Sequence, residues 1–126
     1  MDLMFDGWTV DTVAFDFSLR LSASGGGGIS IEVPVMFEHG GAAEIVQIGA
    51  SDRSGDGTFD ALAGLTVDKV IADAGCKLTV TFTDGTRLIA RPVPLYESWE
   101  ALAPNRVQYL CAPGPELVTY GLNPDT

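Results

Sequence analysis

The sequence predicts a mostly β fold, an antiparallel sandwich or barrel of about eight strands built from two similar halves, with one short helical turn. Three observations support this prediction. Apolar and polar residues alternate along most segments, turn-forming residues separate those segments, and one short motif occurs twice. Alternation with a period of two places one set of side chains on a single face, which is typical of half-buried strands.

The repeated motif is G-x-T-V-D-x-V, which begins at Gly7 and again at Gly64. Similar material follows each copy, so we expect halves over about residues 7–51 and 64–120, joined by a connection over 52–63. Two copies are too few for a solenoid, so each half must cover the apolar face of the other. The length of 126 residues then predicts a single domain spanning 1–126.

In the first half, alternating apolar residues predict strands over 15–21 and 29–35 that form a hairpin with one apolar face. The loop between them contains four consecutive glycines, Gly25 to Gly28, and is expected to be flexible. Another strand is expected around 46–48. The correspondence between the halves predicts that Glu38 and Glu97 occupy equivalent places.

In the connection, residues 60–63 predict one helical turn that Gly64 ends. Strands over 76–82 and 87–91 form a second hairpin. A three-residue loop over 83–85 pairs Val80 with Leu88 on the apolar face, with Gly85 in the left-handed conformation. We expect a short helix near 96–102 and a further strand around 107–109.

Seventeen acidic against seven basic residues give a net charge of −10, which disfavours nucleic acid and anionic membranes and permits a basic protein partner. The N-terminal residues lack a basic leader region, and no apolar run approaches the roughly 20 residues that span a bilayer, so a cytoplasmic location is expected. Cys76 and Cys111 are expected to be buried reduced thiols, although a disulfide between them stays open.

Several short motifs carry a resemblance to a known family. They are the two G-x-x-V-x-x-V segments, the run Asp84-Gly85-Thr86-Arg87-Leu88 leading to Pro92, and the run Tyr96-Glu97-Ser98-Trp99-Glu100. On these motifs the chain resembles an uncharacterised bacterial family of small acidic β domains, a domain of unknown function, from Gly7 to about Tyr120. The resemblance implies a shared fold and no assigned chemistry.

The segment around Trp99 provides the first candidate site. Glu97 and Glu100 flank Trp99, and an exposed aromatic with an acidic rim is typical of a protein interface. The alternative is aromatic packing in the core beneath exposed acids.

The acidic loop that contains Asp52, Asp56 and Asp60 provides the second candidate site. Its oxygens and Gly57 follow the spacing of a calcium-binding loop, but Ala63 stands where the bidentate glutamate belongs. We therefore predict no metal there and keep the three aspartates as interface candidates.

The chain offers little for catalysis. His39 is the only histidine, a G-x-S-x-G motif is absent, and closely spaced metal ligands are lacking. The sequence therefore predicts no enzyme and no cofactor. It favours a non-catalytic protein-binding module, in its sharpest form an immunity (antitoxin-type) protein that neutralises a basic toxin. The alternative is a small-molecule-binding β domain with a cavity between the halves, where Trp8, Tyr96, Trp99 and Tyr109 either line the cavity or fill it as core.

Overall fold

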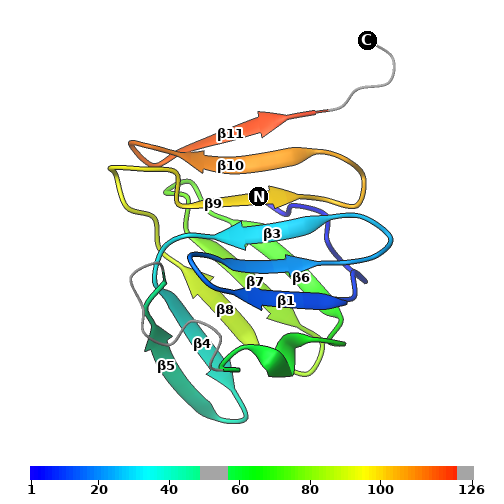
Figure 1. Cartoon of the computed structure of the whole chain (residues 1–126). Coiled ribbons are helices and arrows are strands. Elements are labelled where there is room, and N and C mark those ends of the chain that lie inside the picture. Colours follow the sequence, from blue (N-terminus) through cyan, green and yellow to red (C-terminus); the bar gives the residue numbers. More distant parts are fainter. Residues whose placement is uncertain (49–56, 122–126) are drawn as a thin grey trace.

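The computed structural model describes residues 1–48 and 57–121 of the chain. Within these residues, eleven strands form two antiparallel sheets that pack face to face, accompanied by one 3-10 turn (Figure 1). The mostly β prediction is confirmed, and the sandwich is the right one of its two alternatives. The strands are more numerous and shorter than the pattern of alternation predicts, because two of the expected strands are each divided.

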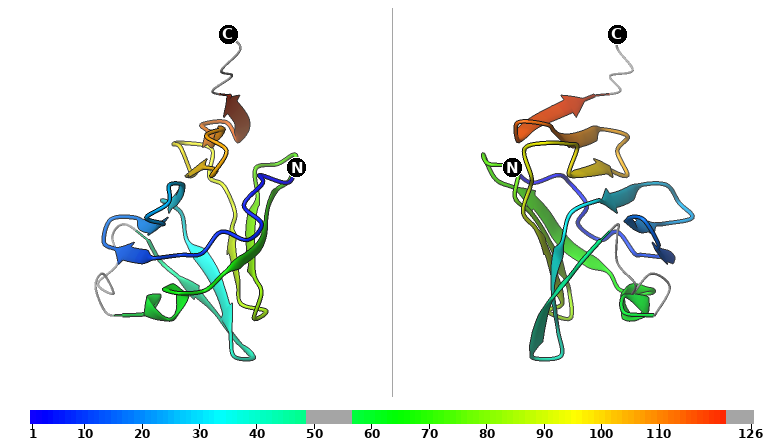
Figure 2. Two further views of the ribbon diagram at one scale, coloured as in Figure 1. Left: turned by 90° about the vertical axis from the view of Figure 1, so that its right-hand side faces the viewer. Right: turned by 60° about the vertical axis from the view of Figure 1, so that its left-hand side comes forward.

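The larger sheet has the strand order β1-β2-β3-β9-β10-β11. Its strands are β1 (Thr12–Phe15), β2 (Leu19–Ser22), β3 (Gly28–Ile31), β9 (Trp99–Leu102), β10 (Gln108–Ala112) and β11 (Glu116–Tyr120). The smaller sheet has the order β5-β4-β8-β7-β6. Its strands are β4 (Val35–His39), β5 (Ala42–Val46), β6 (Val67–Ala72), β7 (Leu78–Phe82) and β8 (Arg87–Ala90), and the 3-10 turn η1 (Asp60–Leu62) precedes β6. The larger sheet extends past the smaller one at β10 and β11 (Figure 2).

The two copies of the repeated motif lie side by side and bond to each other as antiparallel segments. The hydroxyl oxygens of Thr9 and Thr66, which are equivalent residues 57 positions apart, lie 3.0 Å from each other. The flanking backbone bonds come in matched pairs: Gly7 N to Val67 O (2.9 Å) with Gly64 N to Val10 O (2.7 Å), and Val10 N to Leu65 O (2.9 Å) with Val67 N to Trp8 O (2.7 Å). A local twofold axis therefore passes between the two threonines.

The strand order follows the same symmetry. The larger sheet continues from β1-β2-β3 into β9 and β10, and the smaller sheet continues from β6-β7-β8 into β4 and β5. Each sheet therefore contains three strands of one half and two of the other, while β11 has no counterpart among the described strands. Ile31 and Ala90 occupy equivalent positions, and they pair with Trp99 and Val35 respectively. This register matches Glu38 with Leu102, so the expected equivalence of Glu38 and Glu97 is wrong.

Two predictions for local structure are confirmed. Val80 pairs with Leu88, and Gly85 has a φ of +91° in the loop between β7 and β8. The expected helical turn is η1, and Gly64 follows it with a φ of +87°. In both places the structure depends on residues close together in sequence, so the local pattern is sufficient.

The expected strands over 15–21 and 29–35 are each divided. Phe17 lies in the turn between β1 and β2 and is 82% exposed, because Asp16 accepts a bond from the Ser18 backbone and closes the turn. Between β3 and β4 the chain crosses from one sheet to the other at Pro34, which lacks a donor for a ladder. Alternation alone does not reveal a change of sheet.

The expected helix near 96–102 is wrong, because residues 99–102 form strand β9. Ile31 pairs with Trp99 on one side of this strand, and Cys111 pairs with Trp99 on the other. Trp99 is 1% exposed, and its indole Nε1 donates at 2.8 Å to the carbonyl of Cys76, in the turn between β6 and β7 of the smaller sheet. Pairing on both edges outweighs a weak local preference for helix.

The glycine-rich loop is held by Trp8. The indole Nε1 of Trp8 donates to the Gly26 carbonyl at 2.9 Å. Gly27 has a φ of +91°, and a Cβ placed on it would lie 2.8 Å from Trp8 Nε1 and 3.2 Å from the Leu102 carbonyl oxygen. The expectation of a freely flexible loop therefore does not fit the contacts at Gly26 and Gly27.

We predict that Gly27→Ala lowers the free energy of unfolding by about 2 kcal/mol, because it combines an unfavourable φ with a clash against Trp8. Gly25→Ala is the matched control, since its Cβ would meet nothing within 4 Å. That control should change stability by less than about 0.5 kcal/mol. Urea denaturation followed by tryptophan fluorescence measures both, and equal effects would contradict the assigned role of Gly27.

Both cysteines are free and buried. Burial in the core, together with the neighbouring Cys111 thiol, raises the pKa of Cys76 to about 12. Since thiolate is the reactive form, native Cys76 should react with iodoacetamide at neutral pH far more slowly than the same thiol in the urea-unfolded chain. Intact-mass spectrometry over a time course gives both rates, and similar rates in the two states would contradict the burial of this thiol.

Candidate functional site

Three glutamates gather on the outer side of the larger sheet, and we call Glu32, Glu97 and Glu100 the acidic cluster. Ser30 pairs with Glu100 in the ladder between β3 and β9. Two pairs further along, beyond Ile31 and Trp99, the Glu32 N–H donates to the Ser98 carbonyl at 2.9 Å. Because Trp99 points into the core, strand alternation directs Glu100 outward. The pairing of β3 with β9 therefore brings together acids that are far apart in sequence.

The carboxylates of the acidic cluster act on one another. The pKa of Glu97 is raised first by partial burial, then by the negative charge of Glu100, a hydrogen bond with Glu100 and the charge of Glu32. Each of these causes disfavours the ionised form of Glu97. A cation placed at this position would relieve the repulsion.

Two exposed apolar side chains lie immediately before Glu97 in the chain. Leu95 is 86% exposed and Tyr96 is 45% exposed. The Tyr96 hydroxyl donates to the Glu32 carbonyl at 3.4 Å, which holds the ring beside the acidic cluster. Ser98 Oγ accepts a bond from the Val93 N–H at 3.0 Å and ties the base of this segment. The exposed aromatic of the segment is therefore Tyr96, whereas Trp99 belongs to the core, as the alternative interpretation had it.

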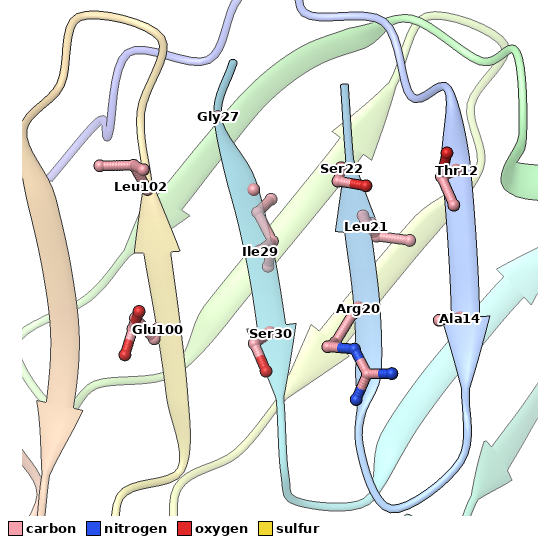
Figure 3. Close-up of a pocket in the computed structure, with 11 residues that line it drawn as sticks. Thr12, Ala14, Arg20, Leu21, Ser22, Gly27, Ile29, Ser30, Glu100 and Leu102 are labelled. Atoms are coloured by element: carbon pink, nitrogen blue, oxygen red, sulfur yellow. The ribbon is translucent and has the colours of Figure 1, made fainter. Parts of the chain in front are cut away.

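An open groove of about 460 Å³ begins at Glu100 and crosses β9, β3, β2 and β1 (Figure 3). Its floor consists largely of small residues, namely Thr12, Ala14, Ser22, Gly28 and Ser30. Arg20 lies on the far side of Ser30 from Glu100, and its guanidinium pairs with Asp16 at 2.8 Å. This pair partly neutralises the Arg20 cation, whereas Glu100 contributes a carboxylate to the other side of the groove.

Much of the positive charge lies away from the acidic cluster and the groove. Strand alternation places Lys69, Arg87 and Arg91 on the outer face of the smaller sheet. Arg87 pairs there with Glu38 at 2.7 Å. The net charge of −10 is therefore distributed unevenly, and the acidic cluster faces away from these bases.

The second candidate site is only partly described. Asp52 and Asp56 lie outside the described residues. Asp60 is exposed at the start of η1, where its backbone N–H donates to the Gly57 carbonyl at 3.1 Å. Over residues 1–48 and 57–121, no group of three or more His, Cys, Asp or Glu side chains is arranged to hold a metal ion. The contacts of Asp60 in this part of the chain do not join it to the acidic cluster.

His39 makes a contact that sequence reasoning missed. Its Nδ1 lies 2.8 Å from Thr86 Oγ1, 47 positions away in the chain. Asp84 accepts a bond from the Thr86 N–H at 2.9 Å, and hydrogen bonds from Thr86 lower the pKa of Asp84. Thr86 is 3% exposed, so this network ties the β4–β5 turn to the β7–β8 turn and keeps the hydroxyl away from solvent. Only the shared sheet brings these residues together.

These features define a two-sheet β protein with an acidic, partly apolar surface patch. The chain belongs to a family of unknown function, DUF6188, whose sequence pattern it matches over residues 1–121. The predicted resemblance to an uncharacterised family is thereby confirmed. No curated protein and no solved structure matches the chain. Among the described residues, no helix has the length and apolar character needed to cross a membrane.

We predict that Glu100→Gln lowers the pKa of Glu97, because it removes the neighbouring negative charge. Carbon-detected NMR titration of the side-chain carboxyls measures this shift. Since a raised pKa in the folded state makes ionisation oppose folding, stability should fall as the pH rises through the titration of Glu97. Glu97→Gln should therefore be slightly more stable than the parent at neutral pH, and an unchanged Glu97 pKa in Glu100→Gln would contradict the coupling.

Proposed function

We propose that this chain is a non-catalytic protein-binding module that receives a basic partner on the acidic cluster and the adjoining groove. The observation that carries the proposal is the crowding of three carboxylates beside exposed Tyr96 and Leu95, at the mouth of an open groove. In this arrangement an aromatic and an aliphatic anchor lie next to concentrated negative charge. Interfaces that bind cationic partners commonly combine these elements.

The electrostatic contribution has two parts. The net charge of −10 attracts a basic partner over several ångströms and speeds its association, an effect that salt screens. At contact, a lysine or arginine of the partner would sit among Glu32, Glu97 and Glu100. This cation would bring the pKa of Glu97 back toward its ordinary value, because it would relieve the repulsion among the three carboxylates.

The sharpest form of the proposal is a cytoplasmic immunity protein of the antitoxin type, which masks a basic toxin. A β-sandwich with an acidic patch suits this role because its charged side chains are in place before the partner arrives. Binding then costs little conformational entropy. The alternative function, a small-molecule site between the halves, is weaker. Trp8, Trp99 and Tyr109, three of the aromatics assigned to line such a cavity, are buried in the core.

A binding experiment tests the proposal. The adjacent genes of the host are searched for one that encodes a basic protein, that protein is purified, and its affinity for this chain is measured by biolayer interferometry at low and high ionic strength. We expect binding that weakens with salt, and a further loss of about tenfold in the double variant Glu97→Gln/Glu100→Gln. Both substitutions preserve shape and hydrogen-bonding capacity while removing charge.

The matched control is Asp6→Asn/Asp68→Asn, which removes two exposed negative charges away from the acidic cluster. It should reduce the salt-dependent association rate only slightly and leave the dissociation rate unchanged. Equal losses of affinity in the two double variants would show that the net charge of the chain, and not the acidic cluster, governs binding. Absence of any salt-dependent binding would reject the proposal.

A further inference from the structure

Among residues 1–48 and 57–121, no strand pairs with the outer edge of β11, and this edge differs from the other edges of the two sheets. Figures 1 and 2 show β11 at the end of the larger sheet, beyond the limit of the smaller sheet. Three of its residues, Val118, Thr119 and Tyr120, have strong β preference, and the strand carries one charge, on Glu116. An edge strand turns alternate N–H and C=O groups away from its neighbour, so such an edge is a template for another strand.

The other edge strands that the structure describes carry protection. Residues at the N-terminus cover β6, since Leu3 N donates to Val70 O and Ala72 N donates to Met1 O, each at 2.9 Å. Antiparallel self-pairing of β5 about its centre would set Glu44 against Glu44 of a second copy. Self-pairing of β1 about its centre would set Asp11, which directly precedes the strand, against Asp16 of a second copy, which directly follows it. Like charges placed directly opposite each other destabilise a strand pair.

Antiparallel self-pairing of β11 brings no like charges together. About a twofold axis at Val118, Val118 meets its own equivalent, Leu117 meets Thr119, and Glu116 meets Tyr120. The apolar row on the outer face of the sheet also continues across the junction. Leu110 pairs with Val118 on that face, and Val118 meets its own equivalent at the axis, so each copy extends the other's outer apolar row.

We propose that two copies of this chain form a dimer through antiparallel pairing of β11 with β11, which joins their larger sheets into one. The twofold axis of such a pair stands perpendicular to the sheet, so the outer faces of both copies point to the same side. The dimer does not depend on the proposed partner function. If the dimer and the proposed partner function both hold, the two acidic clusters would lie on one surface. A target with two basic sites would then bind the dimer with added avidity.

The self-association should respond to salt in the opposite sense to binding of a basic partner. Each copy carries a charge of −10, so salt screens the repulsion between copies and strengthens the dimer. A basic partner would instead bind more weakly as salt rises. Failure of one proposal is therefore distinguishable from failure of the other.

Sedimentation equilibrium of the full chain over a concentration series, at low and high salt, tests the dimer. We expect a monomer–dimer equilibrium that Val118→Lys weakens by about tenfold or more, because two like charges then meet at the axis. Ile45→Lys is the matched control, since it adds the same charge at an exposed position of the β5 edge and should leave the equilibrium unchanged.

A charge-swap experiment guards against a variant that simply misfolds. Val118→Lys and Val118→Glu should each be monomeric alone, and mixing them should restore a dimer, since lysine then meets glutamate across the axis. Circular dichroism confirms that each variant keeps its strands. A wild-type chain that stays monomeric at every concentration and salt, or a dimer that Ile45→Lys and Val118→Lys weaken equally, would overturn the proposal.

Discussion

The structure depends on the antiparallel contact between the two copies of the repeated motif. Thr9 and Thr66 meet at a local twofold axis, and matched backbone bonds on either side lock one half to the other. Because the halves then exchange strands, neither sheet can form from one half alone. The exchange explains why a chain of 126 residues buries a continuous core with short strands.

Trp99 links this scaffold to the candidate site. Its indole bonds to the Cys76 carbonyl of the opposite layer, and its strand lies between β3 and β10. With the tryptophan fixed inward, alternation forces Glu100 outward, and the pairing with β3 sets Glu32 nearby. The acidic cluster is thus a direct consequence of the exchanged strand β9, and Tyr96 is exposed because it belongs to the crossing that leads into that strand.

The two surfaces considered for binding follow different physical rules. The acidic cluster presents charge that a folded chain keeps at some cost, since the carboxylates repel one another. The β11 edge presents unpaired backbone groups and little charge. β11 also lies outside the twofold correspondence, so the symmetric part of the fold does not require it.

The sequence by itself determined the β class, the two related halves, the β7–β8 hairpin with its register, and the turn before Gly64. These features depend on period-two alternation and on turn chemistry, both of which are local. The tertiary structure decided the division of strands at Phe17 and Pro34, the conversion of 96–102 from an expected helix to β9, and the burial of Trp99. It also brought Glu32 to Glu100 and His39 to Thr86, because pairing between distant strands, rather than any local pattern, sets which side chains meet.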